Sequence, residues 1–177
     1  AFEIPADSPI FADAAEFVKW NPKTTDTESR KLRAIKLYQE LIRFHSNDAN
    51  KNALIDVDLW RLVYGKSQAF GEKKNANYKK ALGEFIAKWA DNQISARARY
   101  RHAQVLHSEG EFVVAHKIAQ QGVDTYPNSP GGAQCHNLVQ QIEAKESQVT
   151  VERIWNNPQP HSAASARSRR AGHPPSL

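Results

Sequence analysis

Residues 98–127 read ARYRHAQVLHSEGEFVVAHKIAQQGVDTYP, and the spacing of the small residues in this stretch decides the fold class. Ala103 and Ala115 are twelve residues apart, and Pro127 follows Ala115 after another twelve. Gly122 lies between Ala115 and Pro127. Apolar residues recur at helical spacing on both sides of a polar turn. Since small side chains let two helices approach closely, the stretch predicts a helical hairpin that ends at Pro127.

These positions resemble the tetratricopeptide repeat, a helical hairpin of about 34 residues. The resemblance covers the small residues and the closing proline. It departs from the repeat at the large aromatic residue expected early in the first helix, because Tyr100 stands one place late and Arg99 occupies its slot.

Earlier alanines extend the pattern. Ala81 precedes Ala115 by 34 residues, and Ala34 precedes Ala81 by 47, which fits a unit with a longer loop. An aromatic residue follows each of these two alanines after four positions, at Tyr38 and Phe85. Neighbouring hairpins bury each other's faces, so about three or more are needed for a stable stack.

We therefore predict an all-α fold of about seven helices, built from antiparallel hairpins that stack as a tetratricopeptide-like α-solenoid. A generic helical bundle is the alternative. Short connections make successive helices antiparallel. A Thr-x-x-Glu capping box, Thr25 to Glu28, is expected to begin the second helix. The first expected helix covers about residues 8–20 and the second begins at 25. The others cover about residues 49–69, 78–89, 95–108, 112–125 and 129–146.

Three segments follow one another along the chain. Residues 1–147 form the helical domain. Residues 148–160 begin with an alternating, β-forming pattern, which predicts one strand that starts a further β domain. Residues 161–177 are rich in Ser, Ala, Arg and Pro, which predicts a disordered tail compatible with vector-encoded sequence. The chain has no methionine, so we expect it to be part of a longer protein.

Charge and hydropathy narrow the classes of partner. Without the three arginines of residues 161–177, the 24 Lys and Arg residues fall to 21, against 19 Asp and Glu. This near balance argues against nucleic acid as a partner, and we interpret the lysines at 73–74 and 79–80 as solvated helix ends. No apolar run reaches the ~20 residues of a transmembrane helix. The single Cys135 excludes an internal disulfide.

The chain as far as about residue 160 resembles the N-terminal helical region of bacterial α2-macroglobulin-family proteins from Bacteroides-like bacteria. The segments that carry the resemblance are residues 5–11, 17–20, 36–41, 126–130 and 151–158. The resemblance implies a large periplasmic or cell-envelope protein involved in protease inhibition. The family's internal thioester needs a Cys two residues before a Glu-Gln pair, and the sequence around Cys135 lacks this motif.

No catalytic or metal-binding pattern emerges. His102 and His107 are five residues apart, about 140° around a helix, which is too far for one metal ion. Asp56 and Asp58 point to opposite sides of a helix, unlike a pair of acid and base carboxylates. Cys135 has no suitably placed histidine to activate it. We therefore expect no enzyme activity, no cofactor and no bound metal.

The sequence points instead to a protein-binding surface. The first helix of each stacked hairpin lines the concave side of the array, and in the best unit it presents Arg97, Tyr100, Arg101, Gln104 and His107. Arginine pairs with carboxylates and tyrosine offers amphipathic contact area. A contact with a neighbouring domain explains these residues equally well. We expect a non-catalytic interaction or scaffold domain of an envelope protein; the alternative is a freestanding cytoplasmic adaptor that binds a peptide in this groove.

Overall fold

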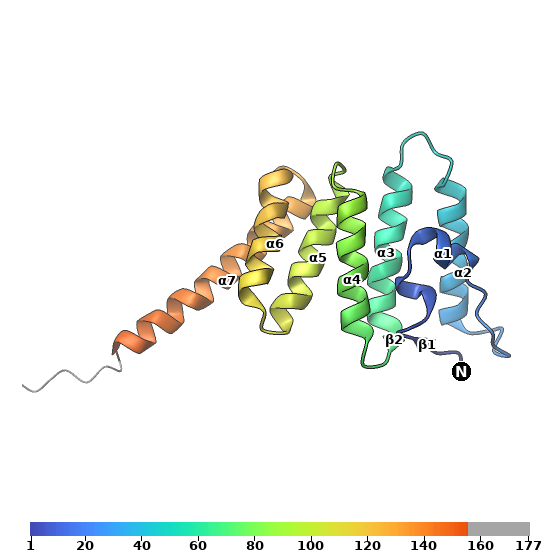
Figure 1. The fold of residues 1–177 in the computed structure, drawn as a ribbon, viewed down its shortest axis with the longest axis horizontal. Coiled ribbons are helices and arrows are strands. Elements are labelled where there is room, and N and C mark those ends of the chain that lie inside the picture. The colour runs from blue at the N-terminus through green and yellow to red at the C-terminus, as the bar shows by residue number, and fades with distance from the viewer. Residues whose placement is uncertain (156–177) are drawn as a thin grey trace, which may run out of the picture.

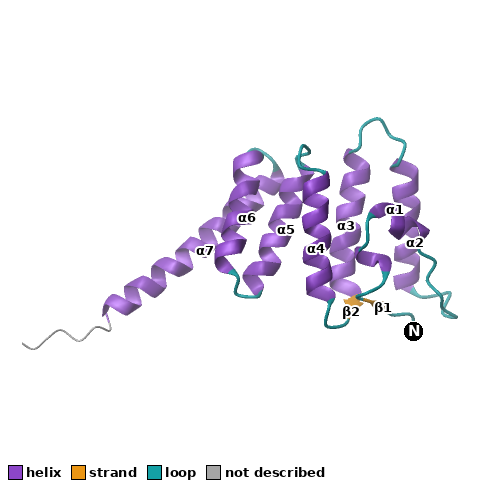
Figure 2. Cartoon of the chain, viewed as in Figure 1, coloured by secondary structure: helices purple, strands orange, loops and turns teal. Residues whose placement is uncertain are grey.

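The computed structural model describes residues 1–155, and it describes side chains for residues 1–145. The described part is an all-α fold, as predicted, with two short strands near the N-terminus (Figures 1 and 2). Its elements are β1 (Ile4–Pro5), η1 (Pro9–Phe11), α1 (Ala14–Lys19), α2 (Arg30–His45), α3 (Asn52–Gln68), β2 (Ala69–Phe70), α4 (Lys74–Lys88), α5 (Ile94–Ser108), α6 (Phe112–Thr125) and α7 (Pro130–Trp155).

Helices α2 to α7 follow one another along an elongated molecule, and successive helices alternate in direction (Figure 1). Helices two places apart therefore run parallel. The side-chain contacts between α3 and α5 have this parallel order: Asp56 pairs with Arg97, and one turn later Trp60 lies beside Arg101. Each helix thus contacts its neighbours in sequence, and α5 also contacts both α3 and α7.

The buried apolar residues form two clusters. The larger cluster joins the N-terminal segment to α2, α3, α4 and α5, with Phe17, Ile35 and Leu82 fully buried. The smaller cluster joins α5, α6 and α7 around Ala103 and Cys135. Helix α5 contributes to both clusters, so it links the two halves of the array.

The small residues that predict close helix contacts are buried. Ala103 and Ala115 are fully covered, and Gly122 is buried where α6 meets α7. A Cβ atom on Gly122 would lie 2.5 Å from the Sγ atom of Cys135. Only glycine allows α6 and α7 to pack at this distance. Ala81, which precedes Ala115 by 34 residues, is also buried, on α4.

The predicted first helix, residues 8–20, is wrong in detail because the chain breaks it into η1 and α1. The backbone is extended at Asp13, whose carboxylate caps α1 by accepting a hydrogen bond from the Glu16 amide at 2.9 Å. The buried guanidinium of Arg61 binds the carbonyl oxygens of Ile10 and Ala12, each at 2.8 Å. These two carbonyl groups therefore bind Arg61 of α3, whereas in a continuous helix they would pair with backbone amides of the same segment.

The predicted capping box is also wrong. Helix α2 begins at Arg30, and the side chain of Ser29 accepts the capping hydrogen bond, from the Leu32 amide. The Asp26 carboxylate instead accepts a hydrogen bond from the Phe2 amide at 3.1 Å. Because Asp26 binds the N-terminal segment, it does not cap the helix, and α2 begins further along the chain, at Arg30.

The strand predicted in residues 148–160 is contradicted as far as the described chain reaches, since residues 148–155 continue α7 as helix. A strand with no partner leaves its backbone groups unpaired, whereas a helix pairs them within the segment. Because β-propensity depends on context, the preceding turns of α7 prevail over Val149, Val151 and Ile154. Residues 156–160 of this segment and the predicted tail, 161–177, lie outside the described residues.

Candidate functional site

The predicted groove residues all lie on α5, and the structure divides them between two neighbouring helices. Arg97 and Arg101 are half-buried and point to α3. Gln104 is exposed on the turn after Arg101. His107 lies instead against α6, where its ring meets the Phe112 ring edge-on with 5.2 Å between centroids. Of the five residues, Arg97 and Arg101 therefore contact α3, Tyr100 lies beside Arg101 and packs on the cluster between α5, α6 and α7, and His107 contacts α6.

Arg97 forms an ion pair across α3 and α5. Its Nη1 atom donates a hydrogen bond to Oδ1 of Asp56 at 2.5 Å. Both side chains are partly exposed, so solvent screens the pair and its contribution to stability is small. The pair fixes the register of the two parallel helices, and Asp56 offsets the charge of Arg97.

Arg101 lies between two aromatic rings. Its guanidinium carbon is 5.9 Å from the centre of the Trp60 ring and 5.5 Å from that of Tyr100. Its Nη1 atom is 3.4 Å from the Gln104 Oε1 atom, and the Gln104 amide in turn donates to the Tyr100 hydroxyl at 3.3 Å. The Nε atom of Arg101 is enclosed and donates to no acceptor among the described residues.

Trp60 and Tyr64 extend the surface along α3, and the sequence prediction missed both. Trp60 is 41% exposed. One turn further on, the Tyr64 ring lies 5.5 Å from the Tyr38 ring of α2. Burial raises the pKa of both tyrosines, so their hydroxyls stay protonated. The spacing Asp56, Trp60, Tyr64 is the signal that places them on one helix face.

We call the set of Trp60, Tyr64, Tyr100, Arg101 and Gln104 the α3–α5 face. Tryptophan, tyrosine and arginine are the residue types that contribute most to binding energy in protein interfaces. The face therefore has the composition of a protein-binding surface.

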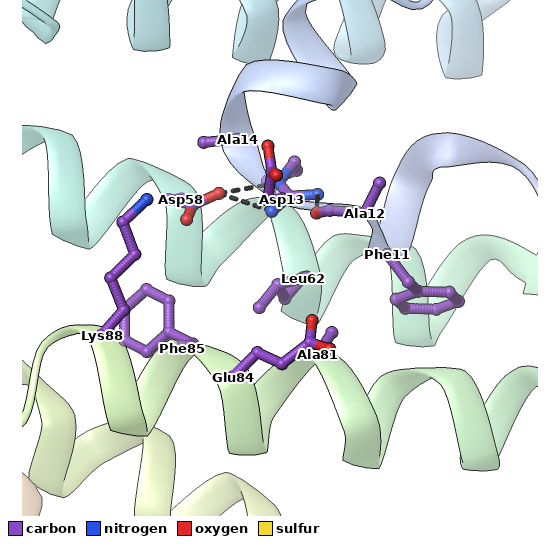
Figure 3. A pocket seen from close by; sticks show the side chains of 11 residues that line it. Phe11, Ala12, Asp13, Ala14, Asp58, Leu62, Ala81, Glu84, Phe85 and Lys88 are labelled. Atoms are coloured by element: carbon purple, nitrogen blue, oxygen red, sulfur yellow. Dashed lines mark hydrogen bonds and ion pairs between the residues drawn. The ribbon is translucent and has the colours of Figure 1, made fainter.

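A small cavity under the N-terminal segment is a competing candidate (Figure 3). It lies between η1, α1, α3 and α4, with Asp13, Glu84 and Lys88 among its lining residues, and its volume is about 50 Å³. Ligand pockets in proteins usually measure ~300–1,000 Å³, so this cavity holds a few water molecules at most. The Asp58–Arg61 ion pair in its wall ties the N-terminal segment to α3 and has a structural role.

Cys135 lies in the contact between α5, α6 and α7. Cys135 is fully buried. Burial raises the pKa of its thiol to about 11, which keeps it protonated and unreactive at neutral pH. Among the described residues, no group of three or more His, Cys, Asp and Glu side chains is placed to hold a metal ion.

Comparison with known proteins finds no match: no protein-family model, no curated protein and no solved structure is similar to this chain. None of the described helices is both long enough and apolar enough to cross a membrane.

Proposed function

We propose that the chain is a non-catalytic protein-interaction domain of stacked helical hairpins, and that it binds a peptide segment of a partner protein on the α3–α5 face. The observation that carries the proposal is the position of Arg101 between Trp60 and Tyr100. An exposed tryptophan beside a held guanidinium offers a large, rigid contact area, and ordering it on binding loses little side-chain entropy.

The tetratricopeptide-like solenoid is the arrangement that best fits the packing. Helices α3, α5 and α7 run in one direction and α4 and α6 in the other (Figure 1). Ala81 on α4 and Ala115 on α6, which are 34 residues apart, are both buried. In such an array the parallel helices α3 and α5 form adjacent parts of one surface. A bound segment would then contact two hairpins at once.

Selection from a phage-displayed library of random peptides tests this function. We expect wild-type protein to enrich related peptides, and Trp60→Ala to weaken their binding by about tenfold or more. Phe44→Ala is the matched control, because Phe44 is exposed on α2 and lies outside the α3–α5 face. Failure to enrich any peptide family, or undiminished binding to the Trp60→Ala variant, would contradict the proposal.

The wider setting, an α2-macroglobulin-like protein of the bacterial periplasm or cell envelope, is a proposal supported by the sequence resemblance. The length of the complete gene tests it. A long gene that encodes macroglobulin β-sandwich domains after this region is the expected result. A short gene that encodes only the helical region would favour a freestanding cytoplasmic adaptor and would leave the binding proposal intact.

A further inference from the structure

We propose that the segment bound by the α3–α5 face is acidic: a side-chain carboxylate of the partner peptide pairs with the guanidinium of Arg101, while an adjacent apolar side chain packs on Trp60. This inference rests on the proposed function and adds the chemistry of the ligand.

The charge of the face supports an acidic partner. Asp56 already offsets the charge of Arg97. Arg101 forms no ion pair with any carboxylate among the side chains that the structure describes, and its Nη2 atom forms no hydrogen bond with them. The face therefore carries one positive charge that the described chain does not neutralise, and a carboxylate is its natural complement.

The geometry around Arg101 favours carboxylate in particular. The guanidinium is a planar fork of donors that matches the two oxygens of a carboxylate. Its carbon atom lies 5.9 Å from the Trp60 ring centre and 5.5 Å from the Tyr100 ring centre, and its Nη1 atom contacts Gln104 at 3.4 Å. A guanidinium that is already positioned loses less side-chain entropy when it binds, so the pair contributes more affinity than a mobile surface arginine would.

Apolar contact is provided next to the charge. Trp60 is 41% exposed, and its ring centre lies 5.9 Å from the guanidinium carbon of Arg101. Tyr64 continues the aromatic surface one turn further along α3. A peptide in which acidic and apolar residues alternate can place a carboxylate on Arg101 and an aromatic or aliphatic side chain on Trp60.

Fluorescence anisotropy with synthetic peptides tests the inference. The probes are fluorescein-labelled, C-terminally amidated 12-residue peptides built from Ser-Glu-Phe-Glu units, with versions in which Gln or Lys replaces every Glu. A Gln peptide with a free C-terminal carboxylate and a uridine decanucleotide are the remaining arms. The full chain is used as wild type, Arg101→Gln, Trp60→Ala and Arg30→Gln. Arg30 is an exposed arginine on α2, so its variant makes the same charge change away from the face. Circular dichroism and melting temperature check that each variant folds.

We expect the Glu peptide to bind wild type and Arg30→Gln alike. The Gln peptide should bind wild type about tenfold or more weakly than the Glu peptide does, and Arg101→Gln should weaken binding of the Glu peptide by about the same factor. Binding of the Glu peptide should also weaken as the salt concentration is raised. The Lys peptide should bind most weakly. Arg101→Lys, which keeps the charge but loses the planar stacking, should give an intermediate affinity.

Three results would overturn the inference. Equal binding of the Glu and Gln peptides, with loss only in Trp60→Ala, would show an uncharged partner and would leave the proposed function standing. Tighter binding of the free-carboxylate Gln peptide than of the Glu peptide would move recognition to a chain terminus. Binding of the oligonucleotide, lost in Arg101→Gln, without binding of the Glu peptide would indicate nucleic acid. If no peptide binds here and the library yields none, the proposed function itself fails.

Discussion

Arg61 is a charged side chain that the fold removes almost wholly from water, with 1% of its surface exposed. The Nε and Nη2 atoms of Arg61 donate hydrogen bonds to Asp58, and the guanidinium carbon of Arg61 lies 4.8 Å from the centre of the Phe17 ring. We expect Asp58→Ala to lower the free energy of unfolding by about 3–5 kcal/mol, because it leaves a buried charge without its partner. Urea unfolding followed by circular dichroism measures the change.

Asp56→Ala is the matched control for Asp58→Ala. Asp56 is on the same helix and pairs with an arginine at the same 2.5 Å, but both partners are partly exposed. Its removal should lower the free energy of unfolding by about 1 kcal/mol or less. Equal losses in the two variants would show that burial of the Asp58–Arg61 pair has no special effect on stability.

Replacement of glycine by alanine should have opposite effects on stability at Gly122 and at Gly83. Gly122→Ala places a Cβ atom 2.5 Å from Cys135 Sγ, so we expect a loss of about 1–3 kcal/mol in the free energy of unfolding. Gly83→Ala, on α4, meets no atom within 4 Å and should gain about 0.5–1 kcal/mol from helix propensity. Thermal unfolding measures both.

Adding Cys135→Ala to Gly122→Ala should recover part of the loss, because the sulfur atom is the group that clashes. A double variant that loses as much as the two single variants together would contradict the close contact of α6 and α7.

Cys135 gives a prediction that depends on pH. Since burial raises the pKa of its thiol to about 11, the folded protein should react slowly with iodoacetamide at pH 8, and the rate should rise toward pH 11. Protein unfolded in urea exposes the thiol and should react with an ordinary thiol's pH profile. Mass spectrometry counts the adducts. Fast labelling of folded protein at pH 8 would show that α5 and α6 do not cover Cys135 on α7.

At the scale of elements, the N-terminal segment belongs to the core. Phe17 of α1 is fully buried, and Gln39 of α2 donates hydrogen bonds to the carbonyl oxygens of Phe17 and Trp20 at 2.9 and 2.6 Å. We expect Phe17→Ala to lower the free energy of unfolding by about 3–5 kcal/mol. The same substitution at Phe44, which is 75% exposed, should change it by about 0.5 kcal/mol or less. Chemical unfolding of both variants decides whether the segment is part of the core or an appendage.

The sequence predicts helices well where packing agrees with local preference. Helical spacing places α5 and α6 almost to the residue, because their small residues serve both the period and the contacts with α7. Prediction fails where a distant group holds the backbone. Arg61 breaks the first helix through Ile10 and Ala12, and contact with Phe2 moves the start of α2. No local pattern contains these contacts, which join residues far apart in the chain.

The strand prediction for residues 148–155 is wrong for another reason. Their β-branched residues favour a strand, but strand preference needs a partner strand to take effect. Among the described residues the strands β1 and β2 pair with each other, near the other end of the array. The segment therefore continues the helix that precedes it.

At the scale of the whole molecule, the sequence predicts candidate binding residues on α5, but it does not predict the residues of α3 that lie beside them. Arg97, Tyr100, Arg101 and Gln104 do lie together on α5, because residues three and four apart share a helix face. The partner residues on α3 follow from the parallel register of the two helices, which only the assembled array defines. The ring of His107, which is also predicted to line the groove, meets the Phe112 ring of α6 edge-on.

Binding of an acidic segment to the α3–α5 face can be measured by an NMR titration of ¹⁵N-labelled protein with the Glu peptide. We expect the perturbed amides to cluster on α3 and α5, around Trp60 and Arg101, and Arg101→Gln to abolish the changes. Perturbations centred on the N-terminal segment or on the exposed side of α2, or none at saturating peptide, would contradict this proposal.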